Sequence, residues 1–506
     1  MLASIATFAV EGVDSREVTV EVDLRRGLPA FAIVGLPDAA VRESRERVRA
    51  ALLNSGLEFP LQRITANLAP AHVRKAGPSF DLALAVAVLA ASDQLPREEL
   101  ASYAVCGELS LSGALRPIRG AVAVADGARR AGYGRLIVPV ENAAEAALVE
   151  GIEVLGVPCI DRMADLFAGR WAPDTPPVRG RTPHATESHG DLSDVRGQRD
   201  AKRALEIAAA GGHNVLMVGP PGAGKTMLAR RLPGILPPPT YDEAVEITRI
   251  QSVAGLSDGS LASSRPFRAP HHTISAPGLI GGGSTPRPGE ITLAHRGVLF
   301  LDELAEFSRP ALEALRQPLE SGRVMVTRGQ RTIGFPAAVM LVGACNACPC
   351  AGRGEECRCD ANDRARYRRR LSGPLLDRID LVCELDAAPA LELVGAPAAG
   401  SDGSAAVRER VVAARERQRV RLAGSGALCN ADMDARLTRR DVRLTAEVRE
   451  RLLECHEVMS LTARGHDRVL RLARTIADLD CRERVEPRDV DEAVGYRLAP
   501  ETRAAA

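Results

Sequence analysis

The strongest constraint on this chain is the octapeptide Gly219-Pro-Pro-Gly-Ala-Gly-Lys-Thr226. It fits the pattern G-x-x-x-x-G-K-[ST], in which glycines let backbone amides turn inward around an anion. Residues 214–219 form an apolar run that predicts a strand, and residues 225–232 predict a helix whose positive end would face the same anion. A strand, a phosphate loop and a helix in this order predict an α/β nucleotide-binding domain with a parallel sheet.

The residues of this loop have distinct expected roles. Lys225 would reach the β- and γ-phosphates, and Thr226 would ligate Mg²⁺. The other loop residues would line the phosphates, and those that are not proline would offer them backbone amides: Gly219, Pro220, Pro221, Gly222, Ala223 and Gly224. The chain has only three lysines, at 75, 202 and 225, so a lysine at this position is informative. Because none follows Lys225, the Asn-Lys-x-Asp motif that reads guanine is absent, and ATP is the predicted nucleotide.

A pair of carboxylates follows the apolar run 298–301. That run predicts a buried strand, and Asp302 and Glu303 emerge at its carboxyl end, where ligands bind in open α/β sheets. Asp302 would hold Mg²⁺ through water, and Glu303 would polarise the attacking water. Two carboxylates after an apolar run often mark no more than the end of a strand. Downstream of a phosphate loop, however, they indicate a site of nucleotide hydrolysis.

Two further polar residues follow the next predicted strand, at 338–343. Asn346 is expected beside the γ-phosphate, where its amide could position the lytic water. Arg378 lies where an arginine would face the nucleotide of a neighbouring subunit and stabilise the transition state in trans. The other 63 of the 66 basic residues are arginines, so spacing alone favours a surface salt bridge for Arg378.

Composition excludes several classes of protein. The longest apolar run, 82–91, is about half as long as a membrane-spanning helix requires. The N-terminus has neither a basic region nor a long apolar core, so a cleaved signal peptide is not expected. The 66 basic and 65 acidic residues nearly cancel, so a nucleic-acid surface would be local, and aromatic residues at 3% argue against broad base-stacking platforms. Five of the eleven cysteines lie between 345 and 359, which indicates a metal or thiol cluster in a reducing compartment, and the cytoplasm is the expected location.

Shifts in composition divide the chain. Residues 1–168 alternate β-rich stretches, as at 19–24 and 31–36, with helical ones, as at 38–54 and 80–91. Two stretches rich in small residues and proline separate this part from an α/β block and a helical, Arg/Glu-rich end. The predicted parts are an N-terminal domain (1–168), a linker (169–191), an ATPase core with the cysteine cluster (192–388), a second linker (389–406) and a helical C-terminal domain (407–506).

These motifs and the segment 265–303, RPFRAPHHTISAPGLIGGGSTPRPGEITLAHRGVLFLDE, resemble the ComM/YifB family of magnesium-chelatase-like AAA+ proteins over nearly the whole chain. The resemblance implies an AAA+ parallel-sheet domain with a helical C-terminal lid, in a hexameric, ATP-driven DNA branch-migration helicase that acts in natural transformation. It makes Arg378 the expected arginine finger, and it places a second arginine sensor at Arg464, with Arg468 as the alternative. The segment 324–335 is implied to be a β-hairpin that points into the central pore with Arg328 and Arg331 on it.

The N-terminal domain resembles the α+β fold of Lon-type proteases in a degenerate form. Gly77-Pro-Ser79 matches the position of the Lon nucleophile, and residues 107–122 match the strand and loop that carry its lysine. The lysine position falls on Val122. A serine without its general base cannot act as a nucleophile, so no peptidase activity is expected. Ser79 is then expected to cap the helix 80–91.

Four cysteines in twelve residues suit a closed structural Zn²⁺ site: Cys348, Cys350, Cys357 and Cys359. The C-x-C spacing is tighter than the usual C-x2-C, so four reduced thiols remain the other interpretation. Residues 364–370 follow with five arginines. They could contact a phosphate backbone, form a solvated helix, or pair with acids at a subunit interface. Three histidines of the insert, at 271, 272 and 295, could contact DNA or nucleotide, or pack.

Three functions fit this sequence. The leading hypothesis is a homo-hexameric DNA translocase that binds branched or single-stranded DNA and no membrane. The second is a chelatase-type motor that remodels a partner enzyme for Mg²⁺ insertion, and the Lon-like N-terminal domain argues against it. The third is a protein unfoldase or a regulatory binding module. The segments expected in the pore have no aromatic-glycine pair of the kind that protein-threading motors use, which argues against an unfoldase. The residues themselves point only to ATP hydrolysis. The prediction that DNA is the partner depends on the resemblance and on the basic segments.

Overall fold

The computed structural model describes residues 1–174, 190–283, 286–328, 331–350, 357–371, 373–386, 402–459 and 461–497. These form two compact units, Met1–Pro183 with Thr240–Ser263, and His184–Pro239 with Ser264–Ala506. Most of the two predicted linkers, 169–191 and 389–406, lies outside the described residues. Among the residues described, no helix is both long and apolar enough to cross a membrane.

The first unit is built on a seven-stranded sheet in the order β3-β4-β2-β1-β5-β8-β9. Alternate residues of a strand face opposite sides, so Ile5 of the first strand joins one apolar cluster while Ala6 and Phe8 join another. Helices α1 and α2 cover the first face and α4 covers the second. The elements are β1 (Leu2–Glu11), β2 (Asp14–Arg25), β3 (Ala30–Val34), α1 (Ala39–Asn54), β4 (Arg63–Ala69), α2 (Asp81–Ala91), β5 (Tyr103–Val105), α4 (Ala121–Arg130), β8 (Arg135–Pro139) and β9 (Glu153–Val157).

The predicted helix at 80–91 is present as α2, and every residue of it is buried. The expectation that Ser79 caps this helix is wrong. Pro78 begins a short 3₁₀ turn, η1 (Pro78–Phe80), so Ser79 lies inside that turn and Phe80 takes the cap position without a side-chain hydrogen bond. The buried first residue of the helix, Asp81, accepts hydrogen bonds from Ser44 and Arg47.

Helix α9 (Tyr241–Ala254) belongs to the first unit, although it follows the phosphate loop in the chain. Thr240 and Glu243 form a capping box at its start, which fixes where the helix begins. Its apolar side packs in a small cluster with a residue of the N-terminal part: Leu148, Ala244, Val245 and Leu261. Arg249 pairs with Asp126 at 3.0 Å and with Asp14 at 3.1 Å. Residues 240–263, which the sequence analysis placed in the second block, therefore pack with the first.

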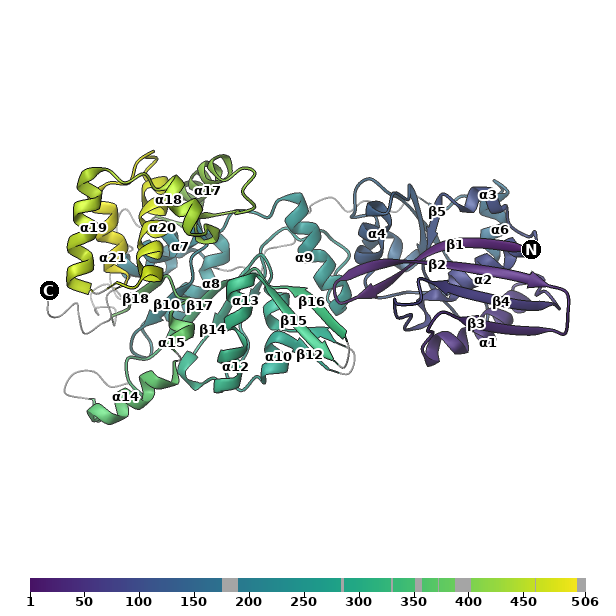
Figure 1. Ribbon diagram of the computed structural model, residues 1–506, viewed down its shortest axis with the longest axis horizontal. Helices are drawn as coiled ribbons and strands as arrows, with labels where there is room; N and C mark the ends of the chain where they lie inside the picture. The colour runs from purple at the N-terminus through teal and green to yellow at the C-terminus, as the bar shows by residue number, and fades with distance from the viewer. Residues whose placement is uncertain are drawn as a thin grey trace. The chain divides into compact units, whose positions relative to one another are not determined.

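The second unit contains a five-stranded parallel sheet in the order β11-β14-β17-β10-β18 (Figure 1). The strands predicted at 214–219, 297–302 and 338–343 are three of them, and their unbroken apolar runs are buried on both faces, as expected for a parallel sheet. The strands are β10 (Val215–Val218), β11 (Phe267–Arg268), β14 (Val298–Leu301), β17 (Met340–Cys345) and β18 (Leu381–Glu384). Because β10 lies between β17 and β18, the loop after β10 adjoins the end of β17.

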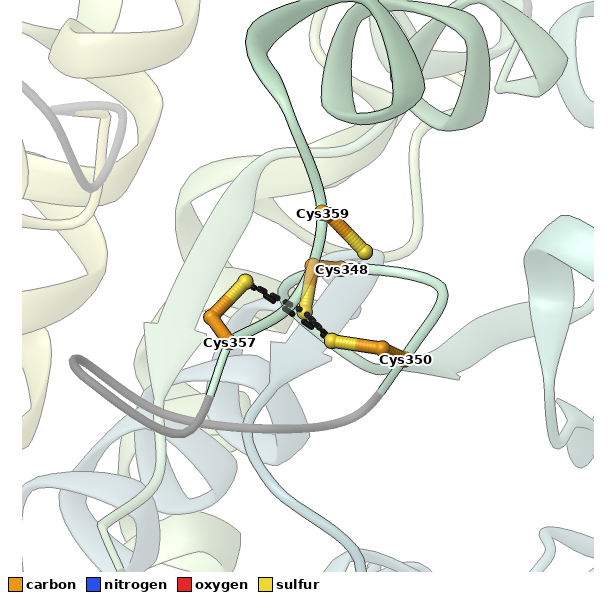
Figure 2. A group of neighbouring side chains, drawn as sticks. All are labelled: Cys348, Cys350, Cys357 and Cys359. Carbon is orange, nitrogen blue, oxygen red and sulfur yellow. Dashed lines mark hydrogen bonds between the residues drawn. The ribbon is translucent and has the colours of Figure 1, made fainter.

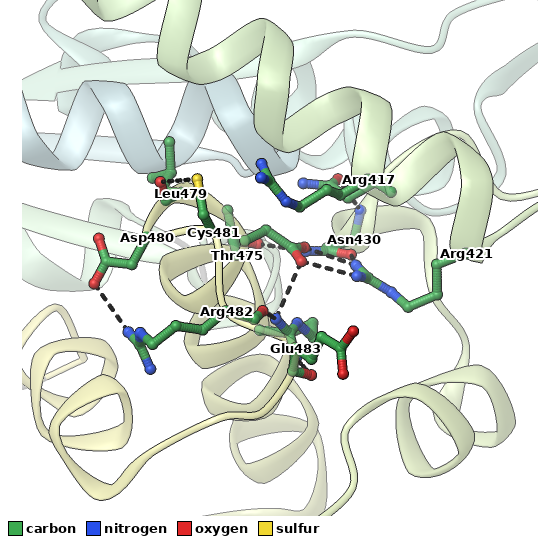
Figure 3. A network of polar contacts seen from close by, with 12 residues as sticks. Arg417, Arg421, Asn430, Thr475, Leu479, Asp480, Cys481, Arg482 and Glu483 are labelled. Carbon is green, nitrogen blue, oxygen red and sulfur yellow. Dashed lines mark hydrogen bonds and ion pairs between the residues drawn. The ribbon is translucent and has the colours of Figure 1, made fainter.

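The C-terminal part of this unit is helical, with α17 (Ser404–Arg421), α18 (Ala435–Asp441), α19 (Ala446–Met459), α20 (Ala463–Leu479) and α21 (Pro487–Gly495). A polar network joins its helices (Figure 3). Arg421 donates two hydrogen bonds to Asp478, at 2.8 and 2.7 Å, and Asn430 donates to Asp478 and to Thr475. Thr475 in turn meets His213 of the sheet-bearing part at 2.8 Å, so the helical part is fastened to the sheet by buried hydrogen bonds.

A hairpin occupies the predicted segment 324–335. Strand β15 (Arg323–Arg328) pairs antiparallel with β16 (Arg331–Pro336), and Arg328 lies opposite Arg331 in the register. The expected β-hairpin is thus confirmed, while its place in a pore stays a prediction.

Candidate functional site

The loop between β10 and α8 (Lys225–Ile235) has the shape of an anion cradle. Gly222 and Gly224 adopt φ of 76° and 91°, which non-glycine residues rarely reach, and the space where their side chains would stand is open. Gly224 is the residue before α8, so the amides at the start of that helix face the same space. The geometry therefore fits a phosphate group.

Lys225 lies at the first position of α8 with only 9% of its surface exposed. Its Nζ donates hydrogen bonds to the carbonyl oxygens of Gly219 at 2.7 Å and Pro220 at 2.9 Å, and to Oδ1 of Asn346 at 3.1 Å. Burial lowers the pKa of Lys225, and the charges of Asp302 and Cys345 oppose that shift. A buried ammonium that meets neutral oxygens is suited to receive an anion. The structure thus brings the predicted phosphate lysine and the predicted sensor amide together.

Thr226 and Asp302 also come together. The Thr226 hydroxyl donates to Oδ2 of Asp302 at 2.7 Å, across the gap between α8 and the end of β14. A hydroxyl and a carboxylate are the oxygen ligands that Mg²⁺ prefers, so this pair fits the metal that accompanies ATP.

Glu303 follows Asp302 in a left-handed backbone conformation, with φ of 50°. Its side chain is 59% exposed, and its carboxylate lies 3.1 Å from Nδ1 of His272, whose ring is tilted against that of His271 with the ring centres 4.1 Å apart. Sequence analysis named these histidines without connecting either to Glu303, because the insert has no periodicity that would place it. His295 instead packs: it is buried and its Nδ1 accepts a hydrogen bond from the backbone of Ala338.

Arg378 is tied within its own chain. Its Nε donates to the carbonyl oxygen of Arg316 at 2.9 Å, and its Nη2 meets Oε2 of Glu320 at 2.5 Å. Arg378, and more weakly Arg464 and Arg316, lower the pKa of Glu320. The predicted arginine finger is therefore paired with an exposed carboxylate, whose pKa the predicted second sensor also lowers.

The two candidates for a second sensor differ in their surroundings. Arg464 is exposed in the first turn of α20. Arg468 is 7% exposed and lies 3.4 Å from Asp380, and burial lowers its pKa. Arg468 thus has a partner inside the unit, which leaves Arg464 as the exposed residue of the two.

Asn214 was missed by the sequence analysis. Its side chain donates to the carbonyl oxygen of Arg378 at 2.9 Å and accepts from the amide of Leu341 at 2.8 Å, and its backbone amide donates to Asp380. It therefore joins the segment that bears Arg378 to the start of β17. The only signal in the sequence is a polar residue directly before an apolar strand.

The four cysteines of the predicted metal site face one another across a small space (Figure 2). Their sulfur atoms all lie within 4.8 Å of one another, and three sulfur pairs are 3.4, 3.6 and 3.7 Å apart. Tetrahedral Zn²⁺ with Zn–S bonds of about 2.3 Å requires sulfur atoms about 3.8 Å apart. The set Cys348, Cys350, Cys357 and Cys359 therefore fits a tetrahedral metal, while residues 351–356 between its halves lie outside the described part.

Three family models match the chain. They are described as "Magnesium chelatase, subunit ChlI" (residues 191–393), "Subunit ChlI of Mg-chelatase" (20–142) and "Magnesium chelatase, subunit ChlI C-terminal" (401–497). The uncharacterized protein YifB of Salmonella typhimurium is 43% identical over 503 residues, which cover 98% of this chain and 97% of YifB. Competence protein ComM of Haemophilus influenzae is 42% identical over 513 residues, with the same two coverages. The chain belongs to the ComM/YifB family of magnesium-chelatase-like AAA+ proteins.

A ComM/YifB protein carries an AAA+ ATPase module, and the parallel sheet with its phosphate loop is that module here. The chain is also 27% identical over 181 residues to Lon protease 2 of Bacillus subtilis, a match that covers 31% of this chain. The matches to YifB and ComM cover nearly the whole chain, and they therefore include both compact units.

Proposed function

We propose that this protein is an ATP-hydrolysing ring motor that moves along DNA. The observation that carries the ATPase part is the convergence of four predicted residues in two pairs, Lys225 with Asn346 and Thr226 with Asp302. Lys225 and Thr226 lie at the start of α8, and Asp302 and Asn346 follow the neighbouring strands β14 and β17, so the four residues lie beside the phosphate loop. Bound Mg²⁺ would neutralise charge on the phosphates, held by Thr226 and by Asp302.

The chain's own residues take separate roles in this proposal. Lys225 binds the β- and γ-phosphates, and Asn346 orients the water beside them. Glu303 accepts the proton of that water, for which its carboxylate must leave His272. Arg378 forms an ion pair with its own Glu320, the kind of salt bridge that its spacing favours, so its proposed role at a neighbouring copy's nucleotide rests on the family resemblance and requires this pair to open. Arg464, near the same carboxylate, would act there too, and a closed ring, most simply a hexamer as in the family expectation, would give every phosphate loop such a neighbour.

DNA is the proposed track, of the branched or single-stranded kind. The relative from Haemophilus influenzae is named a competence protein, and this chain has a hairpin with Arg328 and Arg331 at its tip and an arginine-rich helix after the cysteine cluster. The family descriptions name magnesium chelatase, which favours a second candidate, a motor that remodels a partner protein during Mg²⁺ insertion. A cytoplasmic location agrees with either candidate.

The first experiment measures steady-state ATP hydrolysis of the full chain alone, with linear duplex, and with a forked or four-way junction of equal nucleotide content. We expect hydrolysis in all three and the highest rate with branched DNA. Native mass measurement with ATP should give six copies. Equal rates with and without every DNA would contradict the DNA part and leave the ATPase part standing.

The first unit is proposed to be a Lon-protease-like domain without peptidase activity. Val122, which takes the place of the Lon lysine, is fully buried in α4 and offers no base. Ser79 lies in η1, and its carbonyl oxygen accepts hydrogen bonds from the amide of Gly107 and the thiol of Cys106. These contacts support a structural place for the segment, and casein or peptide libraries should not be cleaved.

The thiol cluster is proposed to hold one structural Zn²⁺. Metal analysis of reduced, purified protein should find about one zinc per chain. A Cys348→Ser, Cys350→Ser double variant should lose the metal and melt at a lower temperature, because two ligands are gone. Cys481→Ser, an exposed cysteine elsewhere, should keep both properties. Metal-free protein whose melting temperature does not change with added zinc would reject the site.

A further inference from the structure

Helix α14 (Ala361–Arg370) follows the thiol cluster and stands clear of the sheet of its unit (Figure 1). Asp360 accepts a hydrogen bond from the amide of Asp363 at 2.7 Å, so an acidic cap begins a helix whose later turns are basic. Its one aromatic residue, Tyr367, is only 7% exposed. The helix therefore has an inner side and an outer side of different chemistry.

The inner side of α14 touches the candidate site at two points. Tyr367 is a buried side chain: burial raises its pKa to about 12, the charges of Cys345 and Glu306 act in the same direction, and the backbone of Asn346 opposes them. Arg370 pairs with Glu306 at 2.9 Å. Glu306 ends the short turn η3 (Leu304–Glu306), which starts directly after Glu303. The helix thus rests on the residues that follow both catalytic strands.

The start of α14 is held by the thiol cluster. Arg364 donates to the carbonyl oxygen of Cys359 at 3.3 Å. Because Cys348 comes two residues after Asn346 and Cys359 two residues before the helix, the cluster joins the sensor segment to α14 through a short stretch of chain. The thiol cluster therefore lies between Asn346 and α14 in the chain.

The outer side of α14 is cationic. Arg366 and Arg369 are exposed, as is Arg358 just before the helix. Within the part of the chain that the structure describes, these three arginines have no carboxylate partner. Arg366 and Arg369 are three residues apart, which places their side chains on one face, with Cβ atoms about 5–6 Å apart. Guanidinium groups at such a spacing can contact successive phosphates of one strand.

We propose that the outer side of α14 binds the phosphodiester backbone of DNA, and that its inner side transmits this contact to Asn346 and to the turn after Glu303. The inference rests on the proposed ATPase, names the surface through which DNA acts on it, and assigns Tyr367 as a positioning residue. The surface has no exposed aromatic side chain among its described residues, so it contacts the backbone rather than the bases, and binding depends on salt rather than on sequence.

The binding test uses the full chain and a labelled fork. Arg366→Gln with Arg369→Gln should weaken binding by about tenfold at moderate salt. The slope of log affinity against log salt should fall by about two, one for each phosphate contact. The matched control is Arg408→Gln with Arg443→Gln, two exposed arginines elsewhere in the same unit. It should bind as the wild type does. Equal binding by both double variants would overturn the proposal, as would competition by polyglutamate as strong as that by DNA of equal charge.

The coupling test uses Tyr367→Phe, which removes the hydroxyl of this buried side chain and keeps the outer arginines. We expect unchanged affinity for the fork and a several-fold smaller ratio of DNA-stimulated to unstimulated ATP hydrolysis. Tyr133→Phe, which removes a hydroxyl bonded to Glu17 in the other unit, is the control and should keep the ratio. A wild-type ratio for Tyr367→Phe would overturn the transmission.

The outcomes separate this inference from the proposed function. If the wild type does not hydrolyse ATP, the proposed function fails, while the binding test still decides whether α14 contacts DNA. If the wild type hydrolyses ATP and binds DNA but the arginine variants bind equally well, only the inference fails.

Discussion

Replacing Lys225 with Ala should abolish nucleotide binding. The ammonium would make at least two charge-assisted hydrogen bonds to phosphate oxygens, at about 1.5–3 kcal/mol each. Their loss corresponds to roughly a 100-fold or greater rise in Kd for ATP. The remaining lysines of the chain, Lys75 and Lys202, lie outside this loop and cannot substitute. Titration with a fluorescent ATP analogue measures the effect directly.

Glu303→Gln is the matched control for this variant. It removes a carboxylate that meets His272 and leaves Lys225, Thr226 and Asp302 in place. Binding of ATP should therefore persist while hydrolysis stops, because the amide cannot accept the proton of the attacking water. If both variants turned over ATP at the wild-type rate, the whole assignment of the site would be wrong.

Replacing Arg378 with Ala should leave ATP binding intact and reduce hydrolysis strongly. An arginine supplied in trans contributes about 10³-fold or more in the better-studied GTPases. We therefore expect a large loss here, in kcat rather than in KM, without carrying over that value. Glu320→Gln is the control, because it breaks the ion pair inside the chain and keeps the guanidinium. It should retain hydrolysis. A slow Glu320→Gln protein would mean that the pair itself, rather than a trans contact, matters.

Mixing decides whether Arg378 acts across an interface. Arg378→Ala lacks the finger and Lys225→Ala lacks the phosphate site, so each protein alone should be inactive. In a mixed ring, some interfaces join an intact phosphate loop to an intact finger, and activity should partly return when subunits exchange. Full activity of Arg378→Ala alone would make this residue the surface salt bridge that its spacing suggested.

The sheet of the second unit could be predicted because its strands are short, unbroken apolar runs. The runs at 214–219, 297–302 and 338–343 could only be buried on both faces, and β10, β14 and β17 lie within a residue or two of them. The pairs Lys225–Asn346 and Thr226–Asp302 follow from the same rule, since polar residues after neighbouring parallel strands meet at one edge.

Other features depend on packing between distant segments, and local patterns do not encode them. The contact of His272 with Glu303 joins an irregular insert to a strand end, and nothing in the spacing marks it. Asn214 and Asp380 meet because two strand starts are neighbours in the sheet. The prediction that Ser79 caps the helix was wrong by a single turn, because Pro78 begins the 3₁₀ turn η1 before α2 starts.

The position of α9 limits how far this protein is modular. The chain leaves the ATPase module after α8, contributes α9 to the other unit and returns at β11, so the two units are joined at three places in the sequence. A truncated protein that starts at residue 190 would keep α9 but lose Leu148, Asp14 and Asp126. Val245 and Leu261 would then face water and Arg249 would lose both ion-pair partners. The N-terminal unit therefore cannot be exchanged or removed by a single cut, and a gene fusion that replaced residues 1–183 would also have to replace 240–263.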